Sequence, residues 1–296
     1  MAPATFRHIL FPIDYSPRCV ATIPLVKEMV RRNGSRLTVM NVVDTVVQVP
    51  GVADVMYFAT VGTPDDPFPA GQKRLARFIR EQFRDIAQDF RVEDVCKQGD
   101  AATSITQYAE RNAVDLIMMP TRGCGTFRRF LLGSITAKVL HDAHCPVWTD
   151  AHVEHQPAWK HMNLCNILCA VDLTEHSDQV IRWALAVARA NSSRLRLVHV
   201  VQLEEIRAYS YYDATFQRVL NEAASEQLAE VQRNAGIDVE SDVEGGDVPK
   251  TVRAAALRHK ADLVVIGRGH IQAPLGRLRT NAYGIIRESP CPVLSV

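Results

Sequence analysis

The sequence predicts an α/β protein made of two tandem doubly wound domains, each with a five-stranded parallel sheet and flavodoxin-like layers of helices on both faces. Three observations support this prediction. The chain has 296 residues, about two typical domain lengths. It repeats its own motifs along its length. Short β-branched runs alternate with longer segments of helical spacing, an order typical of parallel strands joined by helices.

The internal repeat is clearest at the expected strands. Residues 7–14, RHILFPID, match residues 165–172, CNILCAVD, at an offset of 158. The offset is 147 between residues 115–120 and 262–267, so the first copy carries eleven extra residues (158 minus 147) between positions 44 and 71. We expect one domain at 1–150 and a second at 164–296, joined by the polar, aperiodic linker 151–163.

The expected elements of the first copy follow from local patterns. The runs ILFPI, LTVMNVV, VEDVC, DLIMM and PVWT read as buried parallel strands. Ser16 followed by Pro17 predicts a helix start, with a capping side chain and then proline at the first helical position. Residues 72–89 have helical spacing and place five apolar side chains on one face, namely Leu75, Phe78, Ile79, Phe83 and Ile86.

Charge and composition exclude several classes of partner. The net charge of +1 gives no reason to expect nucleic acid or an anionic membrane as a partner. No apolar run approaches the ~20 residues of a transmembrane helix, and the N-terminal residues lack a signal-peptide pattern. We therefore expect a cytoplasmic protein. The seven cysteines are scattered without a CxxC pair, which favours free thiols and predicts no metal site.

Two segments at expected strand ends carry residues suited to a ligand. In open α/β sheets, ligands bind beyond the carboxyl ends of the strands. The first segment is Pro12-Ile13-Asp14, in which the nearby Ser16 takes the capping role and leaves Asp14 for a ligand. The second is the loop at 120–136, where glycines permit positive φ and close approach, and a helix start near Ser134 supplies N–H groups. Ser134 and Thr136 add hydroxyl donors, so this loop suits phosphate groups.

These motifs resemble those of the universal stress protein family. Its ATP-binding members carry G-x2-G-x9-G-[ST] after strand 4 and an Asp closing strand 1. Here the corresponding residues are Pro120-x2-Gly123-x9-Gly133-Ser134 and Asp14, and both copies close on Cys-Pro-Val. The resemblance implies an adenine nucleotide alpha hydrolase-like fold that binds ATP, with or without Mg²⁺. The implied site comprises Pro12, Ile13, Asp14, Val42, Met119, Pro120, Gly123, Gly133, Ser134, Ile135 and Thr136, with Asp14 at the adenine–ribose end and Val42 at the adenine.

Each copy departs from the family pattern in its own way. In the first copy, Pro120 replaces the first glycine and has no N–H to donate. In the second copy, His270 replaces the second glycine, and Arg279 stands where Gly133 stands in the first. An arginine would fill the phosphate space, and a side chain at a positive-φ position is strained. We therefore expect ATP in the first copy, and weak or no binding in the second.

Three functions agree with these patterns. The first is an ATP-binding protein with a regulatory or stress-response role, acting on an unidentified protein partner. The second is a slow ATP-hydrolysing enzyme, although we find no catalytic set in the sequence. The third is a nucleotide-free scaffold. The resemblance further implies that the closing strands of the two copies pair as an intramolecular pseudo-dimer, and it leaves a homodimer of chains open. The apolar segment 45–70 either covers the nucleotide or packs on the other copy.

Overall fold

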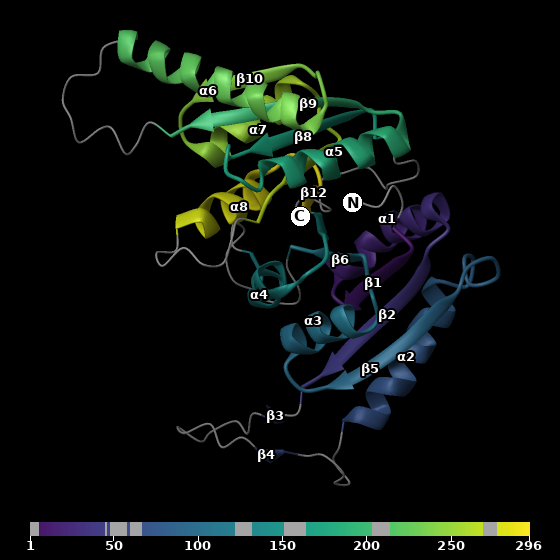
Figure 1. Cartoon of the computed structure of the whole chain (residues 1–296). Helices are drawn as coiled ribbons and strands as arrows, with labels where there is room; N and C mark the ends of the chain where they lie inside the picture. The colour runs from purple at the N-terminus through teal and green to yellow at the C-terminus, as the bar shows by residue number, and fades with distance from the viewer. Residues whose placement is uncertain are drawn as a thin grey trace.

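The computed structural model describes residues 6–44, 46–47, 58–59, 67–121, 132–150, 164–202, 214–268 and 277–296. Figure 1 shows two layered α/β halves stacked one above the other, here called the N-terminal copy and the C-terminal copy. The expected linker 151–163 lies outside the described residues, as does most of the 45–70 segment.

The N-terminal copy alternates strands and helices as the sequence predicts. Its five main strands lie in the order β5-β2-β1-β6-β7 and are all parallel. A two-residue pair, β3 (Val46–Val47) and β4 (Phe58–Ala59), forms a separate antiparallel sheet. The main elements are β1 (His8–Ile13), α1 (Pro17–Asn33), β2 (Arg36–Val43), α2 (Phe68–Gln82), β5 (Val92–Gln98), α3 (Ala101–Arg111), β6 (Leu116–Pro120), α4 (Ser134–Asp142) and β7 (Val147–Asp150).

The C-terminal copy repeats this topology. Its strands lie in the order β10-β9-β8-β11-β12 and are again parallel. The elements are β8 (Asn166–Val171), α5 (Ser177–Asn191), β9 (Arg194–Val201), α6 (Ala214–Ala235), β10 (Ser241–Gly245), α7 (Val248–Arg258), β11 (Leu263–Ile266), α8 (Arg277–Glu288) and β12 (Val293–Ser295). The doubled, doubly wound architecture expected from the repeat is confirmed.

The two copies join through their closing strands. Strands β7 and β12 pair antiparallel, with Trp148 opposite Leu294, and this pairing makes one ten-stranded sheet. A second contact joins the residue Phe6, just before β1, to Trp183 of α5, whose ring stacks on the Phe6 ring at a centroid distance of 6.0 Å. The expected pairing of the Cys-Pro-Val segments is therefore found within this chain.

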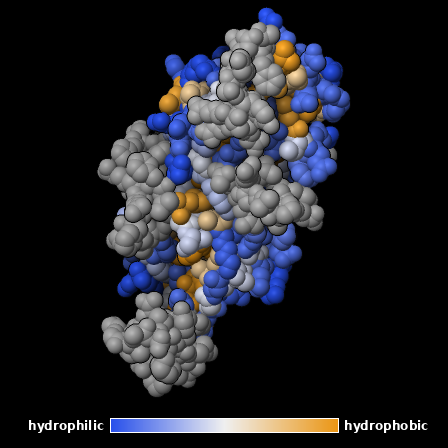
Figure 2. All heavy atoms as spheres, turned by 90° about the vertical axis from the view of Figure 1, so that its left-hand side faces the viewer, coloured by the Kyte–Doolittle hydropathy of each residue, from blue (hydrophilic) through white to orange (hydrophobic). Residues whose placement is uncertain are grey.

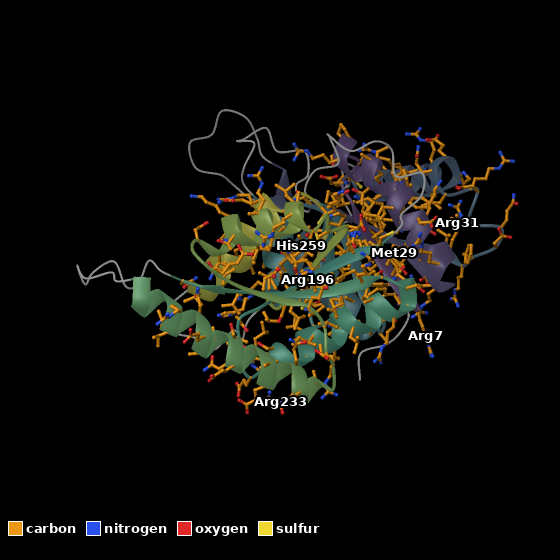
Figure 3. All side chains as sticks on the ribbon, turned by 90° about the horizontal axis from the view of Figure 1, so that it is seen from above. Arg7, Met29, Arg31, Arg196, Arg233 and His259 are labelled. Carbon is orange, nitrogen blue, oxygen red and sulfur yellow. The ribbon has the colours of Figure 1, made fainter. Side chains whose placement is uncertain are left out.

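The hydrophobic core lies on both faces of the sheet. Successive side chains of a strand point to opposite faces, so Ile9 and Phe11 join one cluster while Leu10 joins the other. Helices turn one face inward in the same way. In Figure 3, Met29 of α1 points into the molecule, where it is buried, whereas Arg31 points outward and pairs with Asp85 at 2.8 Å.

The local signals at helix ends were partly correct. Ser16 accepts a hydrogen bond from the Cys19 N–H at 3.1 Å, and Pro17 begins α1, as predicted. The predicted helix at 72–89 instead begins at Phe68 and ends at Gln82. Phe83 caps it, and residues 83–89 form turns that bring Phe83 and Ile86 into the core. The apolar spacing correctly predicted that Phe83 and Ile86 are buried, but turns place them in the core where a helix was expected.

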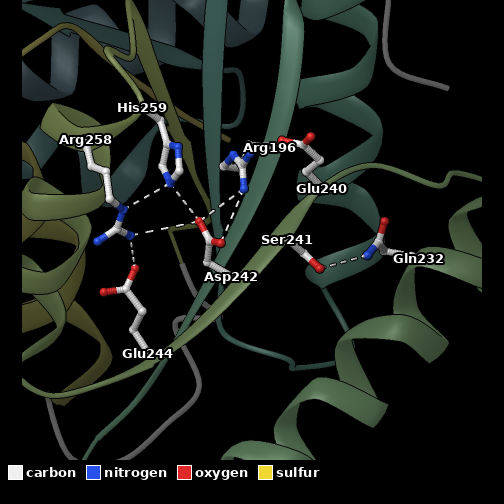
Figure 4. Close-up of polar contacts among 8 residues, drawn as sticks. All are labelled: Arg196, Gln232, Glu240, Ser241, Asp242, Glu244, Arg258 and His259. Carbon is white, nitrogen blue, oxygen red and sulfur yellow. Dashed lines mark hydrogen bonds and ion pairs between the residues drawn. The ribbon is translucent and has the colours of Figure 1, made fainter.

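The edge of the C-terminal sheet carries a charged network. Figure 4 shows Asp242 of β10 accepting from Arg196 of β9 at 3.3 Å and pairing with His259 at 2.8 Å. Glu240 pairs with Arg196, and Glu244 pairs with Arg258. Charges on an edge strand oppose pairing with another chain. Among the described residues, no helix is both long and apolar enough to cross a membrane.

Candidate functional site

A pocket lies at the carboxyl ends of the N-terminal strands. It has a volume of about 480 Å³ and is lined by residues of β1, β2, α2, α3, β6 and α4. This volume is within the range of small-molecule sites, roughly 300–1,000 Å³. In Figure 2, hydrophobic residues reach the surface in the lower half of the molecule, which the N-terminal copy forms, between hydrophilic flanks. The pocket lies where ligands bind in open α/β sheets.

Most of the site residues predicted from sequence meet in this pocket. Gly133 and Ser134 adjoin the pocket at the start of α4 but are not among its lining residues, and Gly123 lies outside the described residues. Eight of the predicted residues line it, namely Pro12, Ile13, Asp14, Val42, Met119, Pro120, Ile135 and Thr136.

The end of β1 turns sharply at the pocket. Tyr15 has a φ of 60°, a left-handed conformation that is costly for a bulky residue. Leu173, its counterpart in the C-terminal copy, has a φ of 58°. Such strain persists only where the surrounding structure imposes it, and it is often found at ligand sites.

The carboxylate of Asp14 is not left free by the Ser16 cap, contrary to expectation. It accepts a hydrogen bond from the Ser16 N–H at 2.9 Å, which closes the turn around Tyr15. The side chain is nevertheless exposed at the pocket, and a carboxylate has about four acceptor positions. Asp14 can therefore hold the turn and also accept hydrogen bonds from ligand hydroxyl groups.

The start of α4 differs in two respects from the sequence-based expectation. Gly133 has a φ of −62°, which any residue can adopt, so the strain argument made for its counterpart Arg279 is wrong. The hydroxyl of Thr136 donates to the carbonyl of Pro120 at 3.1 Å and is not a free donor. This bond ties the first turn of α4 to the end of β6. Ser134 keeps an exposed side chain at the helix start.

Some backbone N–H groups at the start of α4 are not used by the helix itself. The Gly133 N–H donates to the Thr121 carbonyl at 2.8 Å, and the first intrahelical bond runs from the Ala137 N–H to Gly133 at 2.8 Å. The N–H groups of residues 134–136 therefore have no carbonyl partner within α4. They lie at the positive end of the helix dipole, which favours an anion.

One wall of the pocket, formed by α2, was not predicted from the sequence. The first turns of α2 bring Gly71 and Arg74 to the pocket. The guanidinium of Arg74 lies 3.9 Å from the ring centroid of Tyr15, and Phe78 contacts the same ring edge-on at 5.2 Å. Burial raises the pKa of Tyr15 to about 12. The amphipathic spacing of α2 gave no sign of this wall, because its residues at the pocket lie outside the apolar stripe.

The corresponding helix of the C-terminal copy starts differently. Helix α8 begins at Arg277, so Arg279 lies inside its first turn, whereas its counterpart Gly133 is the residue that precedes α4. The segment Arg277-Leu-Arg has good helix formers and no glycine, which explains the earlier start. His270 lies outside the described residues.

Comparison with known proteins places the chain in a family. The profile of the universal stress protein family matches residues 5–149 and again residues 165–296. The chain belongs to the universal stress protein family. Two matches in one chain agree with the repeat and with the two halves of the sheet.

Individual relatives support the same assignment. A universal stress protein of Staphylococcus aureus strain USA300 is 34% identical over 139 residues, covering 44% of this chain and 82% of the relative. A solved universal stress protein from Archaeoglobus fulgidus covers 99% of this chain and 97% of its own, with a TM-score of 0.65 and 20% identity. One shorter universal stress protein, solved in complex with cAMP, has a TM-score of only 0.32 and 23% identity, too slight a likeness to bear on this site.

Proposed function

We propose that this universal stress protein binds an adenine nucleotide, ATP, in the N-terminal pocket and has a regulatory or stress-response role. The observation that carries the proposal is the meeting of an apolar pocket, a carboxylate and an open helix start at one place. Asp14, Met119 and Thr136 come from distant parts of the sequence, and all three line the same cavity.

The chemistry of the lining fits the parts of ATP separately. Val42 and Met119 give an apolar surface for a purine ring, and Asp14 can accept hydrogen bonds from ribose hydroxyls. The first turn of α4 offers N–H groups to the phosphates. Arg74 adds a positive charge at the α2 wall. The eleven proposed site residues include Gly133 and Ser134 at the phosphate end and Gly123 in the preceding loop.

Pro120 is compatible with this proposal. Its side chain lines the pocket, and its carbonyl already accepts from Thr136. A glycine at this position would add an N–H, so we propose that the proline removes one donor but leaves the apolar contact. The start of α4 then supplies the donors to the phosphates.

We propose that the C-terminal copy binds ATP weakly or not at all. The support is the early start of α8, which puts Arg279 and Thr280 inside its first turn. We also propose domain limits of 1–150 and 164–296 with a linker at 151–163, a cytoplasmic location, and an unidentified protein partner that responds to the nucleotide.

The test is a calorimetric titration of the whole chain with ATP, with and without Mg²⁺. We expect one ATP per chain. The Gly133→Arg variant should lose binding, because arginine then occupies the phosphate end. The φ of −62° at Gly133 suits arginine, so this variant should keep its fold. Gln107→Arg, an exchange at an exposed position of α3 that does not line the pocket, is the matched control and should bind normally.

Wild-type protein that takes up no ATP at millimolar concentration would contradict the proposal and favour the scaffold function. Phosphate release from ATP that Ser134→Ala reduces would instead favour the slow hydrolase.

A further inference from the structure

The helix that starts at the pocket is held by the other copy. Arg268 follows β11 in the C-terminal copy, and its guanidinium reaches across to the end of α4. Nη1 donates to the carbonyls of Ala143 at 2.9 Å and Leu140 at 3.4 Å, and Nη2 donates to the carbonyl of Cys145 at 2.9 Å. Carbonyls at a helix end lack intrahelical donors, and a cation there also suits the helix dipole. Arg268 therefore caps the C-terminal end of α4.

A second side chain of the C-terminal copy holds the middle of α4. The hydroxyl of Tyr283, on α8, donates to the carbonyl of Ala137 at 3.0 Å. Figure 1 shows α4 and α8 facing each other where the two copies meet. Both contacts bind α4 from the C-terminal copy, whereas Thr136 binds its first turn to β6 of its own copy.

Arg268 is itself fixed in place. Its N–H donates to the Val296 carbonyl at 3.0 Å, which extends the pairing of β11 with the last strand. A Cβ at the preceding Gly267 would lie 2.9 Å from Cγ2 of Val180, so helix α5 packs tightly against this backbone. In the described part of the chain, the Arg268 guanidinium forms no ion pair with a carboxylate. Its hydrogen bonds to α4 and the following turn are its main polar contacts.

At the two equivalent positions of the N-terminal copy, the described residues give no matching support to α8. By the repeat, Arg268 corresponds to Thr121 (offset 147) and Tyr283 to Ala137 (offset 146). The Thr121 hydroxyl donates to the Asp150 carbonyl at 3.4 Å within the N-terminal copy, and alanine has no polar side chain. The N-terminal copy thus supplies no equivalent of either side chain to α8. The copy with the altered nucleotide loop holds the helix of the copy with the pocket.

This arrangement matters because α4 is short. It has nine residues, and isolated helices below about 12–15 residues are marginal in water. Its order depends on contacts from outside the helix. If the far end frays, the N–H groups of the first turn lose their fixed direction.

We propose that Arg268 and Tyr283 of the C-terminal copy are positioning residues for the phosphate end of the N-terminal pocket. They hold α4 so that its first-turn N–H groups point at the phosphates. This inference rests on the proposed binding of ATP. It gives the C-terminal copy a role in binding that does not require a nucleotide of its own.

The test compares two ligands that differ only at the phosphate end. ATP and adenosine are titrated into the full chain by calorimetry, for the wild type and for Arg268→Met, Arg268→Lys and Tyr283→Phe. We expect Arg268→Met to weaken ATP binding about tenfold, a typical size for coupling between distant sites. Tyr283→Phe should weaken it about threefold, as one hydrogen bond predicts. Arg268→Lys should recover part of the loss, and adenosine affinity should stay within about twofold throughout.

The matched control is Arg258→Met, which removes an arginine of the same copy that pairs with Glu244, away from α4. It should leave both affinities unchanged. Equal losses for ATP and adenosine would indicate general damage to the pocket and would overturn the inference, as would unchanged ATP affinity in both Arg268→Met and Tyr283→Phe. Should Arg268→Met fail to fold, Tyr283→Phe decides, because it keeps the ring. If the wild type and the variants bind ATP equally well, the positioning role alone is refuted. If the wild type does not bind ATP, the proposed function is refuted as well.

Discussion

Whether Gly71→Ala raises or lowers the free energy of unfolding should depend on the neighbouring residue Val43. Gly71 lies in α2 beside the pocket, and a Cβ built on it would be 2.6 Å from Cγ2 of Val43. Carbon atoms in contact prefer about 3.5–4.0 Å, so the helix and β2 would have to separate by about 1 Å. Valine is β-branched and cannot turn away at low cost. Overpacking of this kind costs about 1–3 kcal/mol.

Helix propensity acts in the opposite direction. Alanine in a helix is about 1 kcal/mol more favourable than glycine. We therefore expect Gly71→Ala to lower the free energy of unfolding by about 1 kcal/mol in the wild type. In a Val43→Ala background the clash is absent, so the same exchange should raise the free energy of unfolding by about 1 kcal/mol.

Urea unfolding of the four proteins of this double-mutant cycle, followed by circular dichroism, measures both changes. A sign reversal between the two backgrounds is the expected result. An effect of Gly71→Ala that is equal with and without Val43 would refute the close contact between α2 and β2, and with it the shape of this pocket wall.

Two further predictions concern stability. Phe83 is fully buried and meets Phe11 edge-on at a centroid distance of 6.3 Å. In urea titrations, Phe83→Ala should therefore lower the free energy of unfolding by about 3–5 kcal/mol. A loss below about 1 kcal/mol would contradict the place of Phe83 in the core. Burial, followed by the nearby Arg36 charge, lowers the pKa of His8 below its ordinary value of 6.5. The fold therefore favours neutral His8, and stability should fall as the pH drops below about 6.5 because the unfolded chain binds the proton more readily. Burial also lowers the pKa of His199. His8→Gln should therefore reduce the pH dependence of the free energy of unfolding between about pH 7.5 and 5.5 without abolishing it. An unchanged slope of this free energy against pH would contradict the lowered pKa of His8.

The architecture could be predicted from sequence because it depends on patterns that repeat. The β-branched runs and the matched Asp14 and Asp172 segments fixed the order of strands in each copy, and the Cys-Pro-Val segments pointed to the strands that pair. Eight of the eleven proposed site residues could be assigned to one pocket because the ends of parallel strands meet at one edge of a sheet.

The remaining features depend on tertiary contacts that leave no periodic signal. Arg74 reaches the pocket from α2 through its stacking on Tyr15, and the sequence carries no mark of that contact. The Thr136 hydroxyl was expected to be a free donor because its partner, the Pro120 carbonyl, lies sixteen residues away in the chain. The sequence pattern gave no role to Arg268, because the pairing of β7 with β12 is what brings it to the end of α4.

The most direct test of ATP binding in the N-terminal pocket is a crystal structure of the whole chain grown with ATP. We expect one nucleotide per chain in the N-terminal pocket, with the purine between Val42 and Met119, the ribose at Asp14 and the phosphates at the start of α4. Electron density for ATP in the C-terminal copy, or an empty N-terminal pocket at saturating ATP, would contradict this expectation.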